Sequence, residues 1–119
     1  MRGKNILVVD DEHDILDFVS HSLSAEGCTV LQAENRDAAY EVLKKLKPDA
    51  VILDLNMAGM TAPEFIQRAK RLQPDICIIL MTAASHAPEK ALELGLEYYI
   101  PKPFDHEDVY HAVSACVRN

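Results

Sequence analysis

Short apolar segments alternate with amphipathic segments along the chain, and this alternation restricts the fold more than any other feature of the sequence. The apolar segments cover residues 5–9, 29–33, 50–53, 76–81 and 98–100. They are rich in β-branched residues, and several are apolar at successive positions, which is typical of strands buried on both faces. Because a helical pattern follows each of them, the order predicts an α/β fold in which helices cover both faces of a parallel sheet.

The amphipathic segments are predicted helices, and capping signals mark several of their ends. Gly27 is an expected left-handed cap, and Pro48 and Gly95 end the second and fourth helices. Thr61 and Glu64 have the spacing of a capping box, in which the hydroxyl accepts a main-chain N–H and the glutamate reaches back. The helices follow the apolar positions Ile15, Phe18, Val19, Ser22 and Leu23, then Ala38, Ala39, Val42, Leu43 and Leu46, and then residues 61–72, 88–94 and a last segment from 105.

Chain length and charge limit the kinds of protein that this sequence can form. With 119 residues, of which 49% are hydrophobic, we expect one domain over residues 1–119 and a core that needs neither disulfides nor a structural metal. The net charge is −7. Nucleic acid and anionic membranes require a basic surface, so neither is expected as a direct partner.

Three scattered cysteines and the absence of a long apolar run bear on where the protein works. Cys28, Cys77 and Cys116 have no metal-binding spacing and would leave one unpaired if any two were bridged. Scattered single thiols are typical of a reducing compartment. The apolar run over residues 76–81 is too short to span a bilayer, and residues 6–9 indicate a strand instead of a signal peptide. We therefore expect a cytoplasmic protein.

Polar residues stand where the predicted strands end, which is where ligands bind in parallel α/β sheets. Asp10 and Asp11 follow the first strand, and Asp54 follows the third. Thr82 ends the fourth strand, and Lys102 follows the fifth. Carboxylates, a hydroxyl and an ammonium group are thus predicted to meet at one edge of the sheet.

This combination of groups favours phosphoryl transfer. Taken singly, an Asp-Asp pair also suits a turn and a helix cap, and a lysine is more often only solvated. Together, three nearby carboxylates repel one another unless a cation neutralises them. Mg²⁺ is the expected cation because it prefers carboxylate, carbonyl and water oxygens. A metal and a lysine offset charge on a phosphoryl group while Asp54 attacks it in line.

Four motifs at the strand ends resemble the receiver domain of two-component response regulators, and the similarity covers essentially the whole chain. One such motif is weak, but four in order are specific. The resemblance implies a doubly wound, flavodoxin-like (βα)5 fold with a five-stranded parallel sheet in the order 2-1-3-4-5. The motifs are Val8-Val9-Asp10-Asp11-Glu12, Leu53-Asp54-Leu55-Asn56-Met57, Met81-Thr82-Ala83 and Tyr99-Ile100-Pro101-Lys102-Pro103-Phe104.

The resemblance also implies what the acidic residues do. Asp54 would accept a phosphoryl group from a phosphohistidine of a histidine kinase or phosphotransfer protein. Asp11, Asp54 and the main-chain carbonyl of Asn56 would bind Mg²⁺ directly, with Mn²⁺ as a possible substitute. Asp10 would act on the metal mainly through a water molecule. The chain would be a signalling switch and not an enzyme, with only self-phosphorylation and autodephosphorylation of its own.

The remaining motif residues are implied to sense the phosphoryl group. Lys102 would pair with Asp54 at rest and with the phosphoryl group afterwards, and a cis peptide bond to Pro103 is expected. Thr82 would move its hydroxyl to a phosphoryl oxygen, and Tyr99 would turn inward. Ala83 would keep the acceptor accessible. The surface of the fourth helix, fifth strand and fifth helix would then change shape. A partner protein would bind there, or a second copy of the chain would bind there to form a homodimer.

The sequence departs from the receiver pattern at two places. Ala58 stands where the family commonly has proline, and Thr61-Ala62 replaces a later Asp/Asn-Gly pair. We therefore expect a more mobile loop at Ala58-Gly59. The segment between Thr82 and Lys102 is slightly shorter than usual, so the fourth helix is expected to differ in length or position.

Two other function classes share some of these features. An aspartate-nucleophile phosphatase also uses Mg²⁺ and an aspartate at a strand end, but it needs a second acid two residues later. Asn56 occupies that position and cannot deliver a proton. A receiver-like interaction module that never carries phosphate generally lacks an acidic residue, the threonine or the lysine, and this chain retains all of them.

Overall fold

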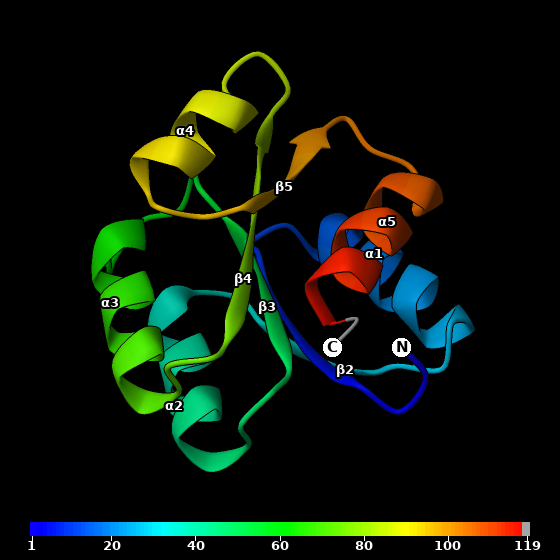
Figure 1. Cartoon of the computed structure of the whole chain (residues 1–119), viewed down its shortest axis with the longest axis horizontal. Helices are drawn as coiled ribbons and strands as arrows, with labels where there is room; N and C mark the ends of the chain where they lie inside the picture. The colour runs from blue at the N-terminus through cyan, green and yellow to red at the C-terminus, as the bar shows by residue number, and fades with distance from the viewer. Residues whose placement is uncertain (118–119) are drawn as a thin grey trace.

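The computed structural model describes residues 1–117 and has a five-stranded parallel sheet at its centre (Figure 1). The strands lie in the order β2-β1-β3-β4-β5, as the resemblance implies. Each outer strand is thus reached by a crossover through a helix, the normal connection for parallel neighbours. Their bounds are β1 Asn5–Val9, β2 Thr29–Ala33, β3 Ala50–Asp54, β4 Cys77–Ala83 and β5 Tyr98–Lys102.

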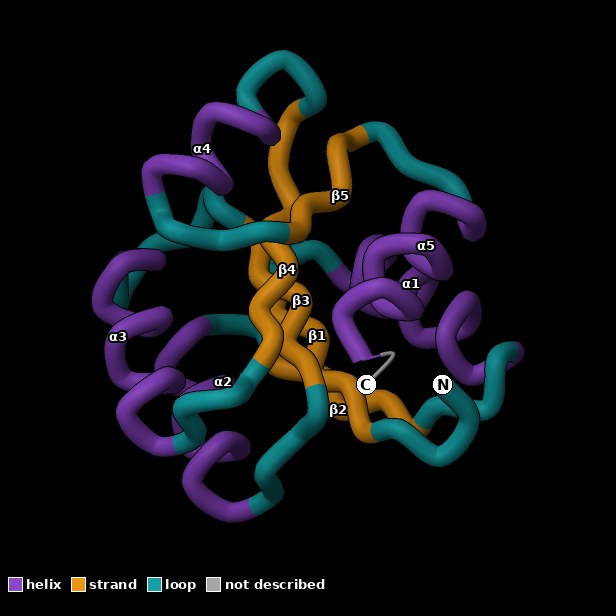
Figure 2. The backbone as a smooth tube through the Cα atoms, in the orientation of Figure 1, coloured by secondary structure: helices purple, strands orange, loops and turns teal. Residues whose placement is uncertain are grey.

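Helices cover both faces of the sheet (Figure 2). α1 and α5 pack together on one face, and α2, α3 and α4 lie on the other. The short α4 agrees with the short segment between Thr82 and Lys102. The bounds are α1 His13–Ala25, α2 Arg36–Lys45, α3 Ala62–Leu72, α4 Ala87–Glu93 and α5 His106–Val117.

The central strands are buried on both faces, which explains their continuous apolar sequences. In β1, Leu7 and Val9 belong to the core under α2 and α3, whereas Ile6 and Val8 belong to the core under α1 and α5. All four side chains are fully buried. Successive strand residues point to opposite faces, so one apolar run supplies both cores.

The predicted helix ends are confirmed in part. Gly27 and Gly95 have φ angles of 86° and 72°, in the left-handed region that favours glycine. The Thr61 hydroxyl accepts a hydrogen bond from the Glu64 main-chain N–H at 3.2 Å, which is one half of the capping box. The Glu64 carboxylate pairs with Arg68 one turn later, so the reciprocal half is wrong.

The expectation of scattered thiols is wrong for two of the three cysteines. Cys77, the first residue of β4, and Cys116, in the last turn of α5, form a disulfide with Cα atoms 5.9 Å apart. Cys28 is free and buried. The two bonded cysteines are 39 residues apart in sequence, and only the packing of α5 against the sheet brings them together.

Candidate functional site

Asp54 and Lys102 meet at the carboxyl edge of the sheet because each is the last residue of its strand. β3 ends at Asp54 and β5 at Lys102, on the two sides of β4. The Lys102 Nζ donates to Asp54 Oδ1 at 2.9 Å and approaches Asp10 Oδ2 at 3.4 Å. Asp10 and Asp54 are 0% and 2% exposed, so this ammonium group contacts two buried carboxylates.

The acidic residues after β1 form a compact cluster. The Asp10 carboxylate accepts a hydrogen bond from the Glu12 main-chain N–H at 2.9 Å, which fixes the turn into α1. Carboxylate oxygens of Asp10, Asp11 and Glu12 all lie within 4.8 Å of one another, the single such group in the described part of the chain. Asp11 and Glu12 are exposed. The cluster therefore has one buried carboxylate and two that solvent reaches.

The ionisation of this site reflects an excess of carboxylates over cations. Burial raises the pKa of Asp54, and the negative charges of Asp10 and Asp11 raise it further, against the opposing effect of Lys102. Burial lowers the pKa of Lys102, but the hydrogen bond and charge of Asp54, together with Asp10, outweigh it and leave that pKa raised. The two shifts differ in cause: burial is the largest effect on Asp54, whereas the neighbouring carboxylates raise the pKa of Lys102 against the effect of burial.

The donor set fits a hard divalent cation. Asp10, Asp11 and Asp54 stand at strand ends on one edge of the sheet, and carboxylate oxygens are the ligand type that Mg²⁺ prefers. The carboxylates that lie within 4.8 Å of one another include Glu12 and not Asp54, unlike the predicted set. Asn56 is exposed in the loop that follows β3, and within residues 1–117 its carbonyl accepts no hydrogen bond. A carbonyl without a protein donor and an excess of negative charge both suit a bound cation.

Thr82, Ala83 and Tyr99 lie on β4 and β5 beside this site. The Thr82 side chain is 2% exposed, and its hydroxyl makes no hydrogen bond to any described residue. Ala83 pairs with Lys102 in the sheet and is exposed. Tyr99 is 39% exposed, on the surface that also includes Asp108 and His111 of α5. The peptide bond from Lys102 to Pro103 is cis, as predicted.

Sequence reasoning missed Arg36, the largest buried charged side chain near the site. It is 2% exposed, although it is the first residue of α2 and looks like a solvated N-terminal residue. Its guanidinium group donates to main-chain carbonyls of the loop between β3 and α3. The only sequence signal was the polar Asn35 cap immediately before it, which accepts from the Ala38 N–H at 2.7 Å.

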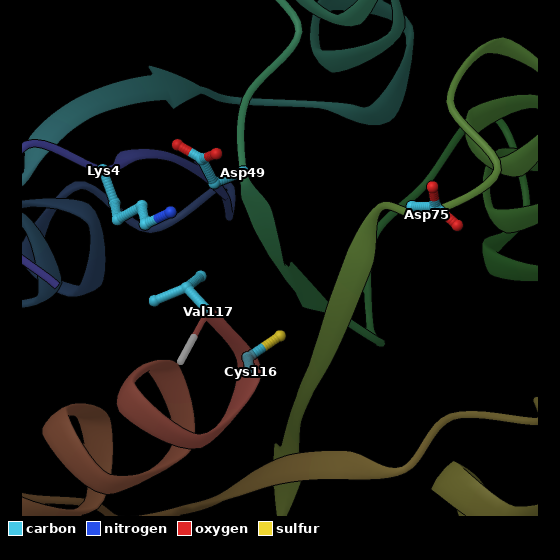
Figure 3. Close-up of a pocket in the computed structure, with 5 residues that line it drawn as sticks. All are labelled: Lys4, Asp49, Asp75, Cys116 and Val117. Carbon is cyan, nitrogen blue, oxygen red and sulfur yellow. The ribbon is translucent and has the colours of Figure 1, made fainter. Parts of the chain in front are cut away.

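A hollow lies at the amino-terminal edge of the sheet, opposite the site at Asp54 (Figure 3). Lys4, Asp49 and Asp75 come from the loops that enter β1, β3 and β4, while Cys116 and Val117 come from the end of α5. This hollow shares no residue with the site at Asp54.

None of the helices in residues 1–117 has both the length and the apolar character that a membrane span requires.

Comparisons with known proteins agree with this arrangement. The family model for the response regulator receiver domain matches residues 6–114 of the chain. The chain is 38% identical to the phosphate regulon transcriptional regulatory protein PhoB of Pseudomonas aeruginosa, covering 99% of this chain and 53% of PhoB. It is 33% identical to sporulation initiation phosphotransferase F of Bacillus subtilis, covering 95% of this chain and 93% of that protein.

Solved structures give the same result. The chemotaxis protein CheY4 of Vibrio cholerae superposes with a TM-score of 0.86 at 28% identity, covering 96% of this chain and 98% of CheY4. NtrX of Brucella abortus gives a TM-score of 0.88 at 26% identity, with 98% of this chain and 27% of NtrX covered. This chain therefore spans about half of PhoB and about a quarter of NtrX. The protein belongs to the response regulator receiver domain family.

Proposed function

We propose that this protein is a phosphoacceptor switch of a two-component system, in which Asp54 receives the phosphoryl group. The observation that carries the proposal is the buried Asp54 carboxylate at the sheet edge, with the Lys102 ammonium group at 2.9 Å and Asp10 beside it. A buried carboxylate held by one lysine is a positioned nucleophile, and the lysine is placed to follow the charge as it moves to a phosphoryl group.

The proposed reaction is a transfer between two residues. An Asp54 carboxylate oxygen attacks the phosphorus of a phosphohistidine on a histidine kinase or phosphotransfer protein. The P–N bond breaks, the imidazole leaves, and an acyl phosphate forms on Asp54. A Mg²⁺ ion held by Asp10, Asp11, Asp54 and the Asn56 carbonyl would neutralise charge on the phosphoryl oxygens. The exposed Ala83 leaves room for the donor.

After transfer, the proposed roles of the neighbouring side chains change. Lys102 exchanges its bond to Asp54 for one to a phosphoryl oxygen, and the Thr82 hydroxyl turns to another. Hydrolysis by water returns Asp54 to its carboxylate form, so the only chemistry is self-phosphorylation and autodephosphorylation. We also propose a cytoplasmic location on the basis of the family alone, because the Cys77–Cys116 disulfide removes the support from unpaired thiols. The face formed by α4, β5 and α5 is the proposed binding surface for a partner or for a second copy in a homodimer.

Phosphorylation of the protein by a small donor should depend on a divalent cation. Acetyl phosphate with Mg²⁺ should add one phosphoryl group to the protein, because the cation offsets the charge of the donor at an already acidic site. Removing divalent cations with EDTA should abolish the labelling, and Mn²⁺ should restore it. Intact-mass spectrometry measures the adduct. No adduct under any metal condition would favour the alternative of an interaction module without phosphate chemistry.

Occupation of the phosphoryl position should move Thr82 and Tyr99. A phosphoryl group can shift a conformational equilibrium only through its different contacts with the two states. Beryllofluoride with Mg²⁺, which imitates the phosphoryl group, should therefore move the Thr82 hydroxyl toward Asp54 and reduce the exposure of Tyr99 from its present 39%. Structures with and without the mimic, together with Tyr99 ring NMR signals, measure both changes. Identical positions of Thr82, Tyr99 and α4 in the two structures would contradict the switch.

A further inference from the structure

Arg36 is a buried cation without a carboxylate partner. Its side chain is 2% exposed, and among the described residues no carboxylate lies within ion-pair distance of it. Charged side chains are rarely buried unless they are paired, because losing water costs several kcal/mol. Burial accordingly lowers the pKa of Arg36, although the nearby charge of Asp54 opposes this shift. A group this costly to bury requires strong compensating contacts.

Those contacts all go to one short segment of main chain. Nη2 of Arg36 donates to the carbonyls of Asp54 at 2.8 Å and Leu55 at 2.7 Å. Nη1 donates to the carbonyls of Met60 at 2.7 Å and Met57 at 3.3 Å. The four acceptors span residues 54–60, which is the connection from the end of β3 to the start of α3. The guanidinium group therefore joins both ends of this loop to α2.

The carbonyl of Asn56 is not among the four acceptors, although its neighbours on both sides are. Arg36 binds Leu55 and Met57, and no described donor binds the carbonyl between them. The loop is thus fixed around Asn56 while its carbonyl stays available to a ligand. A hydrogen-bonding residue that fixes a metal ligand through the main chain has the same effect as outer-shell partners of side-chain ligands.

We propose that Arg36 is a positioning residue that holds the loop over residues 55–60, and with it the Asn56 carbonyl, in the geometry that the Mg²⁺ site requires. This inference rests on the proposed function, since it assigns Arg36 a role toward that metal. Arg36 does not touch the phosphoryl group. It acts through the main chain.

The loop needs such support because its own sequence does not make it rigid. Ala58 provides no proline ring to restrict the main chain, and Gly59 has a φ angle of 91° and the wide conformational freedom of glycine. Arg36 binds the carbonyls immediately before and after this Ala58-Gly59 turn. Hydrogen bonds from a charged donor are about twice as strong as neutral ones, so four of them restrain the loop effectively.

Lysine can replace arginine only in part in this role. The planar guanidinium group presents five N–H donors in a fixed fork, whereas a lysine ammonium is a compact group on a flexible stem. The fork reaches two pairs of carbonyls, and Nε is left buried without a partner. All of its hydrogen bonds therefore go to the loop carbonyls. This is expected of a residue that positions the loop, and not of one that only fills space.

The test compares Arg36→Met and Arg36→Lys with the control Arg68→Met. Arg68 lies on α3, is 41% exposed and pairs with Glu64, so it reports the effect of removing a surface guanidinium group. Isothermal titration with MgCl2 gives the Mg²⁺ affinity, NMR hydrogen exchange follows the amides of residues 55–60, and thermal melting gives stability. We expect Arg36→Met to weaken Mg²⁺ binding about tenfold or more and to speed exchange at these amides. Arg36→Lys should show smaller changes in the same direction, and Arg68→Met should show neither.

A folded Arg36→Met protein with wild-type Mg²⁺ affinity and unchanged loop exchange would overturn the proposal. If Arg36→Met does not fold, the same measurements on Arg36→Lys decide. Loss of the fold in both variants would show that Arg36 is needed for folding and would also overturn the proposal. The proposed function fails separately, if the unmodified protein binds no Mg²⁺. In that case, faster hydrogen exchange at residues 55–60 in Arg36→Met would still show that Arg36 holds the loop, but its role toward the metal would be rejected.

Discussion

Asp54→Asn should lose all labelling by acetyl phosphate while remaining folded. The amide has nearly the shape of the carboxylate, and its oxygen can still accept the Lys102 hydrogen bond that is now 2.9 Å long. It has no negatively charged oxygen to attack phosphorus, so no acyl phosphate can form. Intact-mass spectrometry after treatment with acetyl phosphate and Mg²⁺ measures this result. Asp75→Asn, at the exposed amino-terminal edge of β4, is the matched control and should label normally.

Stability distinguishes this loss from unfolding. Burial and the charges of Asp10 and Asp11 raise the pKa of Asp54 above its ordinary value of 3.8. A carboxyl group whose pKa is raised by folding stabilises the fold at low pH, and this contribution disappears as pH rises through the raised pKa. At neutral pH, Asp54→Asn should therefore melt no lower than the unmodified protein. Undiminished labelling of a well-folded Asp54→Asn protein would place the acceptor elsewhere.

The fold followed from the sequence because its signals are repeated and local. Most of the apolar segments have the length and β-branched content of a buried strand, and each overlaps one of the five strands of the sheet. The strand ends were less well defined. β5 continues past Ile100 to Lys102, because Pro101 and Lys102 extend the pairing with Thr82 and Ala83, which an apolar pattern does not indicate.

Residues whose roles depend on distant partners were harder to predict. Arg36 begins a helix, where an arginine is usually solvated, but α2 packs beside α3 and places it against the loop after β3. Phe18 shares the apolar face of α1 by its spacing, but it is 41% exposed and its ring lies 5.7 Å from that of Phe104 in the loop after β5. In both cases the relevant neighbour is far away in sequence, and no local period could identify it.

Lys102→Met should bind Mg²⁺ more tightly and accept phosphate more slowly. The Lys102 ammonium group now lies 2.9 Å from Asp54 and 3.4 Å from Asp10, so it competes with a cation for the same carboxylates. Removing that positive charge should strengthen Mg²⁺ binding by roughly tenfold, equivalent to about 1.4 kcal/mol. The same change removes the ammonium group that would stabilise the transferring phosphoryl group, and loss of one such contact typically slows a reaction by about 10²–10³-fold.

The opposite signs of these two effects make the Lys102 experiment informative. A variant that was merely damaged would lose both metal binding and labelling. Without Mg²⁺, Lys102→Met should melt at a lower temperature, since Asp10 and Asp54 are buried and lose the ammonium group that both contact. Mg²⁺ should recover much of this loss, because a ligand that binds only the folded state stabilises it. Isothermal titration, labelling rates and melting temperatures measure the three effects, with the exposed Lys44→Met as control. Weaker Mg²⁺ binding in a folded Lys102→Met protein would show that this lysine supports the metal site instead of competing with it.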